Sequence, residues 1–169
     1  IGYTSASSGR QGYRVLTGSH LDQIEEAPES LRDPLKALSS YLDKAMKKLT
    51  NTKDVVKRPV QQWTQKLSGD TVPIMNDEGA SYGMLDITLY PTDKIEKGKV
   101  VCSSHVDPGL FSISLHSSSS GLQMYDKAEF KWVDVPKGMY VIWAGDAAVK
   151  VGAANRAGIH RFVSNGDEE

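Results

Sequence analysis

Short apolar segments follow one another from Met84 to the end of the chain, separated by turn residues. Each is rich in branched and aromatic side chains: "MLDITLY", "KVVCSSH", "LFSISLH", "LQMYD", "FKWVDV", "MYVIWA", "AVKV" and "GIHRFV". Many short strands at this spacing predict a sandwich, a jelly roll or a barrel. In "LFSISLH" apolar and small polar residues alternate, so we expect one face of that strand to be buried.

The first half of the chain carries a helical pattern instead. Asp33 and Pro34 have the features of a helix start, and apolar residues then recur every three or four positions: Leu35, Leu38, Leu42, Ala45 and Leu49. Residues 1–30 are rich in Ser and Gly and are expected to be irregular. We therefore divide the chain into a helical and irregular flanking segment, 1–83, packed on a β core, 84–169.

Composition narrows the classes of function. The chain has 169 residues, 39% hydrophobic and 24% charged, with a net charge of −1, which is typical of one globular domain without a nucleic-acid or membrane partner. Cys102 is the only cysteine, which fits a reducing, cytoplasmic setting. No run of eighteen apolar residues is present. Because the sequence opens at Ile1 and ends at "DEE" directly after a predicted strand, we expect a fragment or a trimmed chain.

One pair of residues suggests chemistry. His105 and Asp107 stand two positions apart at the end of "KVVCSSH", so in a strand their side chains project to the same side. Taken alone, a hydrogen-bonded surface pair is the favoured interpretation. With His160 from "GIHRF" they make two imidazoles and one carboxylate, the set that holds non-haem Fe(II) and leaves further positions open. A structural zinc site would use four ligands, usually with several cysteines.

Six fragments in order then resemble the C-terminal catalytic core of the iron(II)/2-oxoglutarate-dependent dioxygenases, in the isopenicillin N synthase-like branch. They are "LYP" at 89–91, "HVDPG" at 105–109, "GLQMYD" at 121–126, "KWVDVP" at 131–136, "VIWAGD" at 141–146 and "AGIHR" at 157–161. The resemblance covers about residues 84–165. It implies a mainly β fold with flanking helices, namely a double-stranded β-helix, which is a cupin-like jelly roll.

The resemblance also implies site residues. The metal ligands would be His105, Asp107 and His160, which would also be the catalytic residues. Tyr90 holds the place of the tyrosine that binds the distal carboxylate of 2-oxoglutarate, and Thr88 stands where the family has asparagine. The arginine and serine that complete this clamp are expected beyond Glu169, and neither Arg156 nor Arg161 matches the motif position.

Other conspicuous side chains receive structural interpretations. Trp132 and Trp143 are expected in the core, and Arg161 should point outward because it follows His160 in a strand. Ser112 lies close enough to the His–Asp pair to line a pocket. His116, beside a serine run, is expected to be solvated.

The hypothesis is thus a non-haem Fe(II)- and 2-oxoglutarate-dependent dioxygenase that oxidises, by hydroxylation, a small organic substrate. Its cofactors would be Fe(II) and 2-oxoglutarate, with ascorbate as a further candidate. Its partners would be O2 and the small-molecule substrate, and the protein is expected to be a monomer. One alternative is a catalytically inactive jelly-roll binding protein. The other is a metal-dependent cupin-type oxygenase that does not use 2-oxoglutarate.

Overall fold

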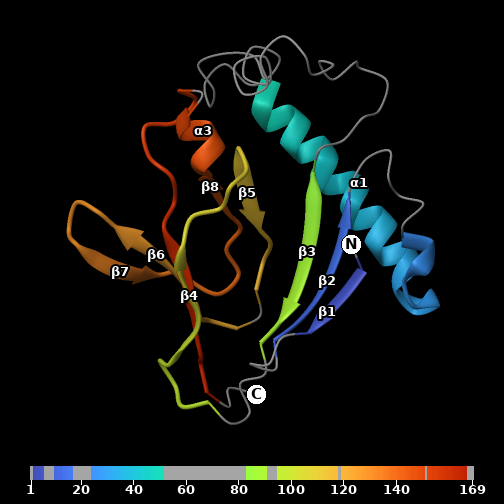
Figure 1. Cartoon of the computed structure of the whole chain (residues 1–169), viewed down its shortest axis with the longest axis horizontal. Coiled ribbons are helices and arrows are strands. Elements are labelled where there is room, and N and C mark those ends of the chain that lie inside the picture. The colour runs from blue at the N-terminus through green and yellow to red at the C-terminus, as the bar shows by residue number, and fades with distance from the viewer. Residues whose placement is uncertain are drawn as a thin grey trace. The chain divides into compact units, whose positions relative to one another are not determined.

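The computed structural model describes residues 2–5, 10–16, 24–51, 83–90, 95–117, 119–150 and 152–166. The chain forms two compact units, Ile1–Tyr90 and Pro91–Glu169 (Figure 1). Residues 52–82, which follow the predicted helix, lie outside the described residues. The division into compact units after Tyr90 does not show which residues form the catalytic core. The predicted boundary of that core, after residue 83, therefore stays a prediction.

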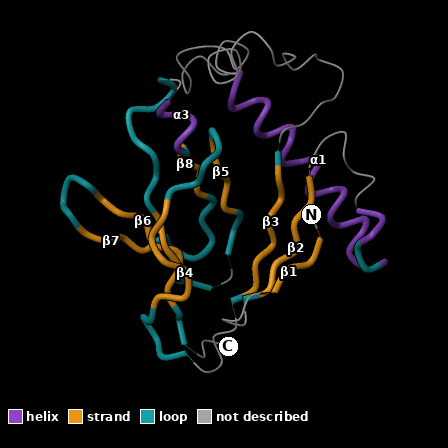
Figure 2. The backbone as a smooth tube through the Cα atoms, in the orientation of Figure 1, coloured by secondary structure: helices purple, strands orange, loops and turns teal. Residues whose placement is uncertain are grey.

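The described residues of the first unit form an antiparallel sheet and a long helix, drawn orange and purple in Figure 2. Strands β1 (Gly2–Ser5), β2 (Gln11–Leu16) and β3 (Met84–Leu89) lie in the order β1-β2-β3, with Tyr13 opposite Ile87. The expectation of irregular structure over residues 1–30 was therefore wrong for β1 and β2. β2 lies between its two partners: β1 pairs with it on one side, and β3, far along the chain, pairs with it on the other.

Helix α1 runs over Glu29–Asn51, so it begins at Glu29 and not at Pro34 as predicted. Its first turn is closed by the Leu31 N–H, which donates to the Pro28 carbonyl at 2.8 Å. Pro34 lies inside the helix, where it removes one backbone hydrogen bond and leaves the turns on either side intact. No helix among the residues described has both the length and the apolar character needed to cross a membrane.

The core of the first unit confirms the apolar stripe of α1. Leu35 is buried, and Leu38 and Leu42 pack against the same cluster. The sheet and the segment before the helix complete this cluster with four further buried side chains: Val15, Ile24, Ala27 and Leu85. Removal of these groups from water is the main source of stability in this unit.

The second unit consists of two antiparallel sheets between which the chain alternates. Its six strands are β4 (Val100–His105), β5 (Phe111–Ser114), β6 (Leu122–Asp126), β7 (Lys131–Asp134), β8 (Val141–Ala144) and β9 (His160–Val163). One sheet has the order β4-β9-β6-β7, and the other pairs β5 with β8. The chain leaves the larger sheet for β5, returns for β6 and β7, leaves again for β8 and returns for β9. This alternation is the winding of the predicted double-stranded β-helix.

One predicted strand is a helix. The segment "AVKV" contributes to α3, a short helix over Asp146–Lys150. Ala147 and Ala148 favour the helix, and the Lys150 ammonium pairs with the Asp146 carboxylate one turn away at 2.6 Å. The helix thus follows β8 directly and leads the chain back toward β9.

Candidate metal centre

Two neighbouring strands place the candidate ligands. His105 is the last residue of β4, His160 is the first residue of β9, and the two are opposite each other in the antiparallel register. The ladder shifts between Cys102 and His105, so a bulge turns the end of β4. Asp107 follows the strand end directly. Residues from distant parts of the sequence therefore meet at one corner of the sheet.

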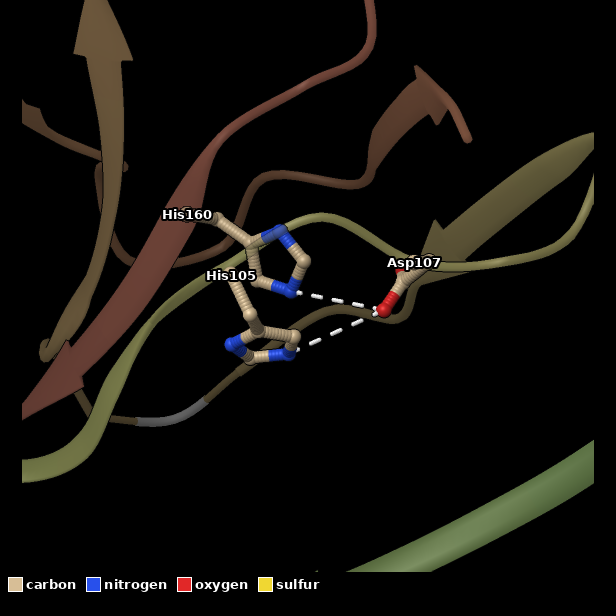
Figure 3. A group of neighbouring side chains, drawn as sticks. All are labelled: His105, Asp107 and His160. Carbon is tan, nitrogen blue, oxygen red and sulfur yellow. Dashed lines mark ion pairs between the residues drawn. The ribbon is translucent and has the colours of Figure 1, made fainter. Parts of the chain in front are cut away.

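The three side chains converge on one point. Oδ1 of Asp107 lies 3.7 Å from Nε2 of His105 and 3.8 Å from Nε2 of His160. Figure 3 shows one nitrogen of each ring turned toward the same carboxylate oxygen. The ring centroids of the two histidines are 4.2 Å apart. Among the residues described, this is the one group of His, Cys, Asp and Glu side chains with the proximity required to hold a metal.

Hydrogen bonds to the backbone determine which ring nitrogen can be a ligand. Nδ1 of His105 lies 2.8 Å from the Ser103 carbonyl oxygen, and Nδ1 of His160 lies 3.2 Å from that of Gly158. A carbonyl oxygen only accepts, so Nδ1 carries the hydrogen in both rings. In a neutral imidazole Nε2 then has a free lone pair, and both of these lone pairs face the site.

Burial supports the same neutral form. The His160 side chain is 3% exposed, and burial lowers the pKa of this imidazole below its ordinary value. The Gly158 hydrogen bond and the Asp107 carboxylate act in the opposite direction. A neutral imidazole is the form that binds metal ions. His105 is 41% exposed and Asp107 25%, so the site is closed behind His160 and open beside His105.

These distances fit a metal ion. Ligand atoms each about 2.0–2.2 Å from one ion can be at most about 4.4 Å apart. The separations of 3.7 and 3.8 Å lie within that limit and exceed the roughly 3.2 Å of a hydrogen bond. Three lone-pair donors thus face one another without bonding directly. Two neutral imidazoles and one carboxylate leave a divalent ion with positive charge, which favours an anionic co-substrate.

The other predicted site residues lie in the first unit. Thr88 belongs to β3 and is exposed, and Tyr90 follows the strand and is half-buried. Their role toward 2-oxoglutarate stays a prediction. Arg161 points away from the candidate ligands: its guanidinium lies 4.1 Å from the Trp132 ring centroid, and its Nε donates to Gln123 Oε1 at 2.7 Å.

Sequence reasoning misjudged the tryptophans. Neither Trp132 nor Trp143 is fully buried, so the prediction that both belong to the core was wrong. Trp132 packs on Tyr125, whereas the Trp143 indole N–H donates to Oδ2 of Asp107 at 2.9 Å. The indole N–H was a signal for this contact, because a tryptophan in a protein interior usually needs a hydrogen-bond acceptor for its N–H.

Comparison with known proteins supports the family predicted from the motifs. No family model matches the chain. Over 100 residues the chain is 28% identical to the 2-oxoglutarate-Fe(II) type oxidoreductase hxnY of Emericella nidulans, an alignment that covers 57% of this chain and 29% of that protein. The resemblance in sequence to 2-oxoglutarate/Fe(II) oxidoreductases is confirmed, while the isopenicillin N synthase-like branch stays a prediction.

Solved structures confirm the fold. The dioxygenase for auxin oxidation 1 of Arabidopsis thaliana, in complex with 2-oxoglutarate, matches with a TM-score of 0.68 at 14% identity, over 99% of this chain and 63% of that one. The dioxygenase for auxin oxidation of rice matches with a TM-score of 0.66 at 16% identity, over 96% and 54%. The chain spans less than two thirds of the length of each relative. The mainly β jelly-roll fold is therefore established.

Proposed function

We propose that this chain is the catalytic part of a non-haem Fe(II)- and 2-oxoglutarate-dependent dioxygenase that oxidises a small organic molecule. The observation that carries the proposal is the convergence of His105, Asp107 and His160, which each offer a ligand atom within 4.8 Å of the other two, in a fold shared with such enzymes. Both Nδ1 atoms are committed to backbone carbonyls, so the lone pairs are oriented before any ion binds.

Each residue has a distinct task in this proposal. His105, Asp107 and His160 would hold Fe(II), the two histidines through imidazole nitrogens and the aspartate through a carboxylate oxygen. When bound, the ion supplies oxidation of a C–H bond by O2, with conversion of 2-oxoglutarate to succinate and CO2. From the motif resemblance, Tyr90 and Thr88 would be the residues that bind the distal carboxylate of 2-oxoglutarate. The buried side at His160 excludes water, and the exposed edge at His105 admits reactants.

The setting and partners are part of the same proposal. The net charge of −1 gives no electrostatic reason to expect nucleic acid as a partner. We expect a cytoplasmic monomer that takes a small-molecule substrate, with ascorbate able to keep the iron reduced. Light scattering coupled to size-exclusion chromatography measures the molar mass in solution. A dimer would contradict the expected monomeric state and leave the proposed chemistry untouched.

The decisive experiment measures succinate formed from 2-oxoglutarate by the iron-loaded protein. Turnover should require Fe(II), O2 and 2-oxoglutarate, and His105→Ala and Asp107→Ala should abolish it. His116→Ala is the matched control, because this histidine is exposed and outside the ligand set. Undiminished succinate in the His105 and Asp107 variants would refute the assignment. Retention of one metal ion without turnover would favour a catalytically inactive binding protein. Oxygen uptake in the absence of 2-oxoglutarate would favour a cupin-type oxygenase.

A further inference from the structure

The two oxygens of the Asp107 carboxylate have different surroundings. Oδ1 faces the two imidazoles. Oδ2 accepts two hydrogen bonds, from the Ser112 hydroxyl at 2.5 Å and from the Trp143 indole N–H at 2.9 Å. Two donors on one oxygen restrain rotation of the carboxylate and hold Oδ1 toward the histidines.

The fold brings the two donors together. Ser112 in β5 and Trp143 in β8 are directly opposite each other in the antiparallel register, so their side chains stand on the same face of this strand pair. The backbone of Asp107 is fixed to the same place, since its carbonyl accepts the Asp146 N–H at 2.8 Å. The side chain of Asp107 is thus held by β5 and β8, and its backbone by the first residue of α3.

Trp143 also contacts the second ligand strand. Its ring centroid lies 4.7 Å from that of His160, with the two planes inclined by 50°. A Cβ atom on Gly158 would lie 2.8 Å from the Trp143 Cβ, so only glycine permits this packing. The Gly158 carbonyl is the partner of His160 Nδ1. One side chain therefore touches both Asp107 and the segment that orients His160.

We infer that Trp143, together with Ser112, is a positioning residue that keeps Asp107 a one-oxygen ligand of the metal. A carboxylate that bound through both oxygens would occupy a further position on the ion. With Oδ2 hydrogen-bonded to Ser112 and Trp143, that position would stay available to the co-substrate and O2. The inference rests on the proposed function, because it concerns the same ion.

Binding of Co(II) to the full chain tests the inference without turnover. Trp143→Phe keeps a ring beside His160 and removes the N–H, and it should weaken Co(II) binding about 10–100-fold. Trp143→Gln restores an N–H donor without the ring and should recover much of that loss. Ser112→Ala removes one donor of two and should weaken binding about 10-fold. The visible absorption bands of Co(II) should also change in Trp143→Phe, because the carboxylate is free to bind through both oxygens.

Trp132→Phe is the matched control, since Trp132 packs on Tyr125 and Arg161. It should leave Co(II) affinity and spectrum unchanged. Circular dichroism establishes that each variant is folded, and Ser112→Ala carries the test if Trp143→Phe unfolds. Wild-type affinity and spectrum in folded Trp143→Phe and Ser112→Ala would overturn the positioning role while the metal site stands. Absence of Co(II) binding by the wild-type chain would overturn the proposed function and this inference together.

Discussion

Among the described residues of the first unit, the buried side chains are almost all apolar, and five of them, from the sheet, α1 and the segment before α1, form one cluster. In the second unit the described residues with buried side chains are one alanine, Ala148, and two polar residues, His160 and Ser164. The first unit is thus stabilised mainly by removal of apolar surface from water, whereas in the second unit one of the buried polar side chains, His160, belongs to the candidate metal site.

The largest effect is expected where backbone segments meet in the second unit. A Cβ atom on Gly145 would lie 2.1 Å from the Gly109 carbonyl oxygen and 2.8 Å from that of Asp107. Gly145→Ala must therefore displace the turn that carries Asp107. We expect a loss of about 4 kcal/mol or more in the free energy of unfolding, the range of severe backbone strain. Urea unfolding measures this loss, and calorimetric titration should show no Mn(II) binding.

Gly109→Ala is the matched control for that variant. Gly109 lies in the same contact, but a Cβ atom added to Gly109 would meet no other atom within 4 Å. Its stability and Mn(II) affinity should stay near those of the wild type. An equal loss in the free energy of unfolding for both substitutions would mean that the turn tolerates no side chain at either position. The close contact of a Cβ atom at Gly145 would then not explain the loss.

In the first unit the comparable test is apolar. Leu35 is 3% exposed, and Leu35→Ala should cost about 2–5 kcal/mol through lost burial and the cavity left behind. Leu31 on the same helix is 45% exposed, so Leu31→Ala serves as the control, with a much smaller loss. Urea unfolding followed by far-UV circular dichroism gives both values. A loss below about 1 kcal/mol at Leu35 would contradict an apolar core in this unit.

Metal binding should stabilise the second unit specifically. A ligand that binds only the folded state at a hundredfold excess over its dissociation constant adds about 2.7 kcal/mol. We expect a Mn(II)-dependent rise in the unfolding midpoint, reversed by a chelator and absent in His160→Ala. Hydrogen exchange should locate the protection in β4 and β9. Equal protection of α1 would show that the metal stabilises the chain as a whole.

Two buried serines sharpen the contrast further. The Ser164 hydroxyl donates to the Ile95 carbonyl at 3.1 Å and accepts from the Gly166 N–H at 3.2 Å, whereas among the described residues the buried Ser39 hydroxyl has no partner. Ser164→Ala should therefore cost about 1–2 kcal/mol, because it leaves a carbonyl and an N–H unpaired. Ser39→Ala should stabilise by about 1 kcal/mol, since it removes an unsatisfied hydroxyl and favours the helix. Thermal unfolding of the two variants distinguishes these opposite signs.

Local patterns explain what the sequence could predict. His105 and Asp107 are two positions apart, and the apolar stripe that begins at Leu35 repeats every helical turn. Each of these two features could therefore be predicted from one short stretch of sequence. The strand β2 was missed because one of its partners, β3, lies more than sixty residues away along the chain, and β1 was missed because it in turn pairs with β2. The contact of Trp143 with Asp107 depends on the register of β5 and β8, which no local pattern encodes.

The smallest effect is expected for an ion pair on the surface of the first unit. Arg14 and Asp86 face each other across β2 and β3, joined by a contact of 2.5 Å, with side chains 49% and 40% exposed. The carboxylate raises the pKa of Arg14, yet water and salt screen an exposed pair. Arg14→Gln should cost only about 0.2–1 kcal/mol, and less at 1 M NaCl. Urea unfolding at low and high salt measures this difference. A salt-independent loss above about 2 kcal/mol would mean that charge, and not apolar burial alone, stabilises the first unit.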